Sequence, residues 1–183
     1  PTLSSAASDV YKRQEINFPK GVLNIIHGRG EKLGDALTTH QDVPIVSFTG
    51  GSDTGKHISK VTAPYFKKLS LELGGKNPNI IFDDCDFDKA VSTASRAAFT
   101  NQGQICLCGS RVFVQNKIYE KFKSALVDKA KKLIVGDPKN SNSHLGAVVS
   151  EEHMNKILLK INEAKKLGGI LLCGGERLSL IHI

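Results

Sequence analysis

Two cysteines in a turn rich in glycine and amide side chains are the first candidates for chemistry. Cys106 and Cys108 lie in Asn101-Gln-Gly-Gln-Ile-Cys-Leu-Cys-Gly-Ser-Arg111, after the end of an expected helix. A thiolate is a strong nucleophile when nearby dipoles favour its charged form. The residues alone leave a buried, inert thiol as the alternative. A metal site is a weaker alternative, because no second cysteine pair follows at zinc-binding spacing.

A glutamate within an apolar run is the second candidate. Glu72 lies in Leu71-Glu-Leu-Gly-Gly-Lys-Asn-Pro78, inside an expected strand and beside two glycines. Burial disfavours the charged form of a carboxyl group, so a buried Glu72 could act as a general base near neutrality. For a single glutamate, the residues favour the alternative of a carboxylate on the solvated face of the strand.

Two glycine-rich turns between an expected strand and an expected helix could bind an anion. The first, Gly28-Arg-Gly30-Glu-Lys-Leu-Gly34, has one residue more than the common dinucleotide fingerprint, and an ordinary turn explains it equally well. The second, Gly50 to Lys56, matches the GxxxxGK start of a P-loop. A P-loop continues with Ser or Thr to hold magnesium, whereas this chain has His57. A nucleotide triphosphatase is therefore disfavoured, and a loop that binds a cofactor phosphate without metal stays open.

Short apolar runs alternate with helical patterns and would position these residues. An apolar run between turn residues predicts a strand, and apolar residues at helical spacing predict a helix. Their alternation predicts an α/β fold with largely parallel sheets and flanking helices. The predicted strands are 21–27, 44–48, 69–73, 79–82, 111–115 and 170–173, and the predicted helices are 31–39, 53–61, 87–101, 118–134 and 151–167.

The helix 87–101 has the clearest buried face and start. The sequence before it imitates a calcium loop, with aspartates at alternate positions, but Lys89 and Ser95 stand where that loop needs Gly and Glu. We therefore expect Asp86 or Asp88 to cap the helix. Five small apolar residues at helical spacing predict its buried stripe: Ala90, Val91, Ala94, Ala97 and Ala98.

The composition excludes several classes of protein. The 183 residues are 40% hydrophobic and 23% charged, which is too apolar for a disordered chain. The net charge is +7, from 25 basic and 18 acidic residues, but the lysines are interspersed with acids rather than gathered in a block. The absence of tryptophan and the 6% aromatic content argue against a platform for single-stranded nucleic acid. No apolar run is long enough to cross a membrane, and the cysteines do not resemble a secreted disulfide framework.

The two ends are predicted not to be natural protein sequence. One DNA encoding of Asp9 to Gln14 is GATGTGTATAAGAGACAG, and the translated reverse complement of that string is Leu178-Ser-Leu-Ile-His-Ile183. The string is that of a transposase end used to prepare sequencing libraries. We therefore assign 1–14 and 178–183 to adapter and leave them out of the fold prediction.

Three motifs in order carry a resemblance to a known family. The chain resembles the aldehyde dehydrogenase superfamily over Glu15 to Arg177, and Glu72 and Cys106 are separated by 34 residues, as that family's base and nucleophile would be. Lys67 to Pro78 and Ile105 to Cys108 are most similar to a branch whose substrate is a semialdehyde. The motifs are Phe48-Thr-Gly-Gly-Ser-Asp-Thr-Gly55, Leu71-Glu-Leu-Gly-Gly-Lys-Asn-Pro78 and Asn101-Gln-Gly-Gln-Ile-Cys106.

The resemblance implies a role for most candidate residues. Cys106 matches the nucleophile that forms a thiohemiacetal and then a thioester, and its backbone N–H would donate to the oxyanion. Glu72 matches the general base that activates water. NAD would be the cofactor, with NADP as the alternative. The cofactor loop matches at Thr49, Gly50, Gly51 and Gly55, where Gly51 replaces the usual serine. The turn near the adenosine matches at Gly28, Gly30 and Gly34. Leu73 and Gly74 match the place where the two domains join.

The resemblance also implies a partial fold. Residues 15–73 would be the C-terminal part of the NAD-binding domain and 74–177 the N-terminal part of the catalytic domain. The family's oxyanion asparagine and its ribose-binding residues would lie outside this sequence. We therefore expect the chain by itself to be inactive and poorly stable, because interrupted sheets have open edges.

The resemblance further implies how the intact protein would occur. It would be a cytoplasmic homodimer or homotetramer that acts on a small-molecule aldehyde, with neither nucleic acid nor a membrane as partner. Two alternatives remain at this point. One is a P-loop nucleotide-binding module that uses Gly50 to Lys56, and the other is a non-catalytic structural relative of the same family.

Overall fold

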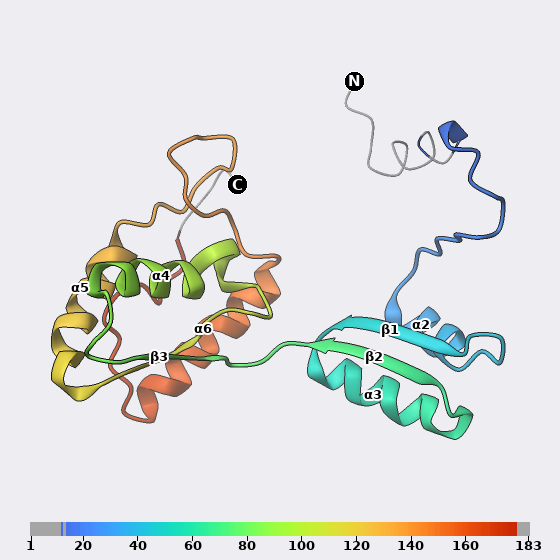
Figure 1. The fold of residues 1–183 in the computed structure, drawn as a ribbon, viewed down its shortest axis with the longest axis horizontal. Coiled ribbons are helices and arrows are strands. Elements are labelled where there is room, and N and C mark those ends of the chain that lie inside the picture. The colour runs from blue at the N-terminus through green and yellow to red at the C-terminus, as the bar shows by residue number, and fades with distance from the viewer. Residues whose placement is uncertain (1–11, 13, 179–183) are drawn as a thin grey trace. The chain divides into compact units, whose positions relative to one another are not determined.

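The computed structural model describes residue 12 and residues 14–178 (Figure 1). The predicted adapter segments fall almost wholly outside these residues. The described chain divides into two compact units: one holds the residues up to Phe48 together with Asp53–Ser70, and the other holds Thr49–Ser52 together with the chain from Leu71 onward. The predicted domain boundary after Leu73 stays a prediction.

The first unit is built around a strand, a helix and a second strand. Helix α2 (Gly30–Thr38) precedes strand β1 (Ile45–Gly50), and helix α3 (Ser52–Thr62) connects β1 to strand β2 (Lys68–Leu73) through a short 3-10 turn, η1 (Ala63–Tyr65). Strands β1 and β2 form a two-stranded sheet, and both arrows point the same way in Figure 1. A helical crossover between neighbouring parallel strands is the βαβ arrangement that the alternating pattern predicts.

The second unit repeats this arrangement. Strand β3 (Pro78–Ile81) leads into helix α4 (Phe87–Phe99) and the 3-10 turn η2 (Thr100–Gly103), and the chain returns in strand β4 (Arg111–Val114). Strands β3 and β4 are parallel and pair from Pro78 opposite Arg111 to Ile81 opposite Val114. The 3-10 turn η3 (Asn116–Ile118), helix α5 (Tyr119–Lys131) and helix α6 (Glu151–Lys166) follow.

The core of the second unit lies between the sheet and the helices α4 and α5. Ile81, Val91, Ala94 and Phe122 form one buried cluster. The Phe122 side chain is fully buried. The rings of Phe122 and Phe87 pack edge to face, with 5.9 Å between the ring centres. The predicted stripe of α4 is confirmed at Val91 and Ala94, which are buried, while its other three alanines are half-buried.

The start of α4 is set by a side chain, as predicted. Asp86 is the N-cap residue, and its carboxylate accepts a hydrogen bond of 3.2 Å from the Lys89 N–H. The first amides of a helix have no partner within the helix, so this bond satisfies one of them. Among these aspartates, Asp86 therefore serves the helix start.

Two predicted strands are wrong. Residues 21–27 and 170–173 contain no strand in the structure. A strand forms only where a neighbour accepts its backbone hydrogen bonds, and the described residues provide no such neighbour for either segment. Several of their apolar side chains are exposed, including Val22, Ile25, Ile26 and Ile170. The two runs are apolar, but the described part of the chain provides no sheet for them to join.

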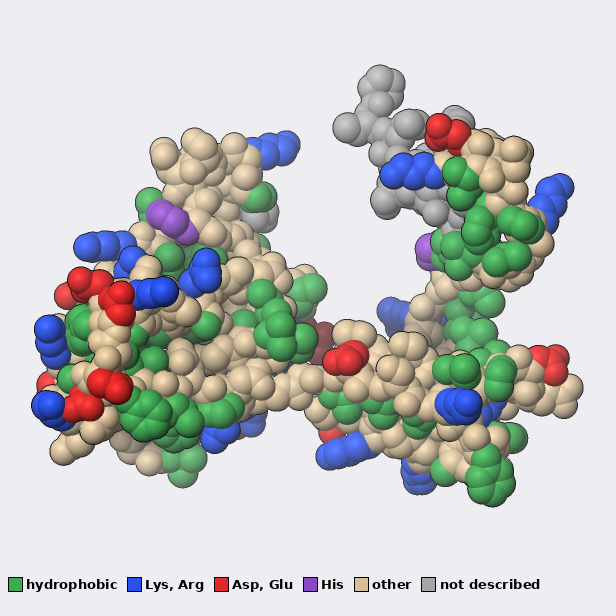
Figure 2. All heavy atoms as spheres, in the orientation of Figure 1, with side chains coloured by type: hydrophobic (Ala, Val, Ile, Leu, Met, Phe, Trp, Pro, Cys, Tyr) green, Lys and Arg blue, Asp and Glu red, His purple; other side chains and the backbone are tan. Residues whose placement is uncertain are grey.

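Large apolar side chains are exposed on both units (Figure 2). On the sheet of the second unit, Ile80 and Phe113 are exposed while their neighbours Ile81, Val112 and Val114 pack in or against the core. One face of this parallel sheet is therefore uncovered, although parallel sheets are usually covered on both faces. No helix of the described residues is long and apolar enough to cross a membrane.

Candidate active site

The turn before Cys106 has an unusual backbone. Asn101, Gln102 and Gly103 have φ values of 51°, 57° and 72°, so three consecutive residues adopt the left-handed region. Glycine adopts this region at little cost, asparagine tolerates it, and glutamine is strained there. A Cβ atom on Gly103 would lie 3.2 Å from the Ala98 carbonyl oxygen. The chain thus leaves α4 through a strained turn of the kind that functional sites often contain.

Cys106 lies on the surface in the turn that follows. The Cys108 N–H donates to the Ile105 carbonyl at 3.1 Å, which closes a turn around Cys106 and Leu107. Cys106 is exposed, whereas Cys108 is buried. The alternative of a buried thiol therefore applies to Cys108 and not to Cys106. Among residues 14–178, the Cys106 N–H donates no hydrogen bond.

Asn77 connects the glutamate motif to this turn. Its side-chain Nδ2 donates to the Cys106 carbonyl at 2.6 Å and to the Cys108 carbonyl at 3.2 Å. The main chain of Asn77 is fixed in turn, because its carbonyl accepts from the Arg111 N–H at 3.2 Å, beside the first pair of the β3–β4 sheet. Sequence reasoning missed Asn77 as a site residue. The signal was an amide side chain just before a strand, but the strand register that brings it to Cys106 was not readable from the sequence.

Glu72 lies apart from these contacts. It is exposed on β2, one residue before the strand ends at Leu73. Of the two alternatives for Glu72, the solvated carboxylate is the one observed in this chain. Glu72 and Cys106 line neither of the two cavities described below. The described residues therefore do not place the predicted base and nucleophile in one cavity.

The first unit contains an open cleft of about 1160 Å³ between α2, β1 and α3. Gly30 and Gly34 line it from α2, and Ser47, Thr54 and His57 line it from β1 and α3. A Cβ atom on Gly30 or Gly34 would meet nothing within 4 Å, so their backbone is open to the cleft. Two predicted cofactor residues, Gly30 and Gly34, thus line this cleft, and the motif Phe48 to Gly55 contributes other residues to it.

The other predicted cofactor residues lie at the edges of elements. Thr49 and Gly50 end β1, Gly51 forms the connection, and Gly55 is buried in α3. Gly28 precedes α2, while Leu73 ends β2 and Gly74 follows it. None of these seven residues lines the cleft of the first unit. Helix α3 begins at Ser52, and the first amides of a helix lack partners within it, so together with the helix dipole they suit an anion.

The geometry disfavours the P-loop alternative. A P-loop wraps its backbone amides around phosphates between the strand and the helix. Here only Gly51 separates β1 from α3, so Ser52 to Lys56 are already helical. The Lys56 ammonium lies 3.9 Å from the Asp53 carboxylate on the same helix, and His57 forms a 2.7 Å hydrogen bond with Asp35 of α2.

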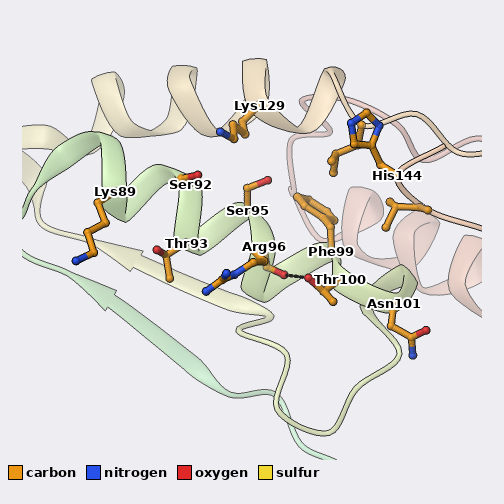
Figure 3. Close-up of a pocket in the computed structure, with 12 residues that line it drawn as sticks. Lys89, Ser92, Thr93, Ser95, Arg96, Phe99, Thr100, Asn101, Lys129 and His144 are labelled. Carbon is orange, nitrogen blue, oxygen red and sulfur yellow. Dashed lines mark hydrogen bonds between the residues drawn. The ribbon is translucent and has the colours of Figure 1, made fainter. Parts of the chain in front are cut away.

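A second cavity, of about 570 Å³, lies in the second unit (Figure 3). Ser92 and Ser95 of α4 point toward Lys129 of α5, and Phe99 and His144 lie at one end. It contains none of the predicted site residues. Within the described chain, no group of three or more His, Cys, Asp and Glu side chains is arranged to hold a metal ion.

Comparisons with known proteins identify the family. The sequence model of the "Aldehyde dehydrogenase family" matches residues 5–181, a range that extends into both terminal segments, whose adapter origin stays a prediction. The chain is 44% identical over 161 residues to 2-aminomuconic semialdehyde dehydrogenase of Bos taurus, covering 88% of this chain and 33% of that protein. It is 45% identical over 161 residues to betaine aldehyde dehydrogenase of Vibrio vulnificus, covering 88% of this chain and 33% of that protein.

Solved structures agree. Betaine aldehyde dehydrogenase of Staphylococcus aureus, in complex with NAD+, superposes with a TM-score of 0.91 at 44% identity, covering 95% of this chain and 35% of that one. The chain thus spans about a third of the length of the relatives it matches. The resemblance of its motifs to 2-aminomuconic semialdehyde dehydrogenase is confirmed, and its α/β architecture is part of the fold of these enzymes. The chain belongs to the aldehyde dehydrogenase family.

Proposed function

We propose that this chain is part of an NAD-dependent aldehyde dehydrogenase that oxidises an aldehyde to a carboxylic acid. The observation that carries the proposal is Cys106 itself, an exposed thiol in a turn fixed through its own carbonyl. Identity of 44% to 2-aminomuconic semialdehyde dehydrogenase supports the reaction type and suggests 2-aminomuconic semialdehyde as the substrate. The intact protein is proposed to be a cytoplasmic homodimer or homotetramer.

The proposed chemistry begins at the thiol. The Cys106 sulfur, as thiolate, forms a bond to the aldehyde carbon, and the carbonyl electrons move to oxygen to give a thiohemiacetal. The Cys106 N–H, which donates to no other group among the described residues, is proposed to donate to that oxygen. Bound NAD accepts the hydride from the same carbon. A thioester on Cys106 remains, and water hydrolyses it to release the acid and restore the thiol.

Glu72 is the proposed general base for the hydrolysis. A carboxylate can take a proton from water as the water oxygen attacks the thioester carbon. The support is its place in the motif Leu71 to Pro78 and its separation from Cys106 along the chain. Its exposed position allows access to solvent water. In this proposal Glu72 acts only after the hydride has left.

Two of the proposed cofactor residues, Gly30 and Gly34, support a site for a dinucleotide. The cleft of the first unit, at about 1160 Å³, is as large as clefts that hold such ligands, and the open backbone at Gly30 and Gly34 allows close approach. Thr49, Gly50, Gly51 and Gly55 are proposed to bind phosphate at the start of α3, with Gly28 beside the adenosine. Leu73 and Gly74 are proposed to lie where the cofactor-binding part, 15–73, joins the catalytic part, 74–177.

Cysteine substitution in the intact parent protein tests the proposal. Cys106→Ser should abolish aldehyde-dependent reduction of NAD, because a hydroxyl is a far weaker nucleophile than a thiolate. Cys173→Ser is the matched control and should retain activity. Unchanged activity in Cys106→Ser would refute the assignment and favour another nucleophile.

A second substitution tests the base. With Glu72→Gln, hydrolysis should slow and the thioester should accumulate as an adduct on the peptide that contains Cys106, detectable by mass spectrometry. Normal turnover in Glu72→Gln would remove Glu72 from the mechanism. A panel of aldehydes compared by kcat/KM then tests the substrate, with 2-aminomuconic semialdehyde expected to rank first.

A further inference from the structure

The side-chain amide of Asn77 bridges two carbonyls on either side of Leu107. Nδ2 lies 2.6 Å from the Cys106 oxygen and 3.2 Å from the Cys108 oxygen. An asparagine amide carries two N–H groups, so it can serve both acceptors at once. The two bonds fix two peptide planes of the turn that presents the Cys106 thiol.

Asn77 is itself held firmly. It is half-buried, and its carbonyl accepts from the Arg111 N–H at 3.2 Å. The Arg111 side chain also donates from Nε to the neighbouring Lys76 carbonyl at 2.8 Å. The amide is therefore anchored to the β3–β4 sheet, which packs on the core of the second unit. A rigid element thus supports a residue on a loop, which is how functional groups are usually held in place.

The rest of the turn is fixed by contacts that do not reach Cys106. The Gln104 side-chain oxygen accepts from the Val149 N–H at 3.1 Å, and the Gly109 N–H donates to the Ala97 carbonyl at 3.1 Å. A Cβ atom on Gly109 would lie 3.4 Å from the Cβ atoms of both Ala97 and Asn79, so the chain is tightly packed there. Among the described residues, Asn77 alone bonds to Cys106 with a side chain.

We infer that Asn77 is a positioning residue for the nucleophile. It orients the main chain of Cys106, and with it the direction of the thiol and of the adjoining N–H, without touching substrate or cofactor. The inference rests on the proposed function in so far as it concerns turnover. It predicts an effect on kcat rather than on KM, because the amide does not bind either reactant.

Three variants of the intact parent protein test the inference. Asn77→Asp keeps the shape but replaces both donors with an acceptor, Asn77→Ala removes the group, and Asn77→Ser offers one donor. We expect kcat to fall about 10- to 100-fold for Asp and Ala and less for Ser, because a small displacement of a reacting group has effects of this size. KM for NAD and for the aldehyde should stay within about two-fold of the wild-type values. Asn77 contacts neither reactant, so its loss removes no binding energy that the ground state and the transition state share.

Hydrogen exchange of the same proteins tests the contact without relying on activity. The amides of Cys108 and Gly109 should exchange about two- to ten-fold faster in Asn77→Asp and Asn77→Ala, as expected when one hydrogen bond that holds a turn is lost. Asn155→Asp, on the exposed face of α6, is the matched control and should change neither exchange nor kcat. The midpoint of urea unfolding reports whether each variant is folded.

The outcomes separate the two hypotheses. Wild-type kcat and wild-type exchange in Asn77→Asp would overturn the positioning role. A loss of kcat that merely follows the loss of folded protein in all three variants would also overturn it, because it would show a structural role alone. A wild-type parent without dehydrogenase activity would refute the proposed function, whereas faster exchange at Cys108 and Gly109 in the variants would still confirm that Asn77 holds the turn.

Discussion

Lys117 and Asp83 lie 34 residues apart in the sequence, and the Lys117 ammonium donates a hydrogen bond of 2.7 Å to the Asp83 carboxylate. Asp83 follows β3, and Lys117 lies in η3 after β4. The Asp83 N–H also donates to the Gln115 side-chain oxygen at 2.9 Å. These bonds join the two parallel strands just beyond their C-terminal ends, whereas Asn77 lies at their N-terminal ends. The short β3–β4 sheet is thus fastened at both ends by side chains.

The ion pair predicts a pH dependence. The hydrogen bond from Lys117 holds the pKa of Asp83 below its ordinary value of 3.8, and the same bond raises the pKa of Lys117 above 10.5. The contribution of Asp83 to stability is therefore present above pH 3.8 and lost as the pH falls through its lowered pKa. The contribution of Lys117 is present below pH 10.5 and lost as the pH rises through its raised pKa.

Lys117→Gln should return the pKa of Asp83 toward its ordinary value, as measured by NMR titration of the Asp83 carboxyl carbon. Lys123→Gln is the control, because Lys123 pairs with Glu120 at 2.6 Å and not with Asp83. An Asp83 titration that is the same in Lys117→Gln and in the wild type would contradict the assignment. Because both groups are near the surface, salt should weaken the effect.

The core of the second unit depends on one aromatic side chain. Phe122 is fully buried between α4, α5 and the sheet and contacts Phe87. Phe122→Ala should lower the free energy of unfolding by about 3–5 kcal/mol, since it removes buried area and leaves a cavity. Urea unfolding of the intact parent protein, followed by far-ultraviolet circular dichroism, measures this loss. Phe82→Ala, at an exposed position of the same unit, should cost much less, and equal losses would contradict the core described here.

The cap of α4 gives a smaller, independent effect. Asp86→Ala removes the acceptor of the Lys89 N–H and should destabilise the chain by about 1 kcal/mol. Asp84→Ala removes the same charge from an exposed position that caps nothing. The difference between the two unfolding midpoints measures the cap. Identical midpoints would mean that the cap contributes nothing to stability.

The chain alone is expected to be inactive and of low stability. In the part of the chain that the structure describes, each sheet has two strands, so every strand there is an edge strand. Apolar side chains such as Phe66, 94% exposed, and Leu107, 82% exposed, are uncovered. Residues 15–177 should reduce no NAD with any of several aldehydes and should bind a hydrophobic dye. Any aldehyde-dependent turnover by this segment would refute the expectation.

Local signals in the sequence determined most of the elements. Helix α4 could be predicted from its apolar stripe and from Asp86, because both act within a few residues. The motifs around Glu72 and Cys106 identified the family for the same reason, since each motif is contiguous. The predictions for 21–27 and 170–173 failed because an apolar run becomes a strand only beside a partner, and the partner is not local.

The tertiary structure alone decided how the two motifs meet. The register that sets Pro78 opposite Arg111 brings Asn77 to the turn of Cys106, and nothing within either motif specifies that register. Burial was decided at the same level: Cys106 is exposed and Cys108 is buried, although both lie in one short turn. Residue types and spacing follow from the chain itself, whereas contacts between distant residues depend on how the strands pair and pack.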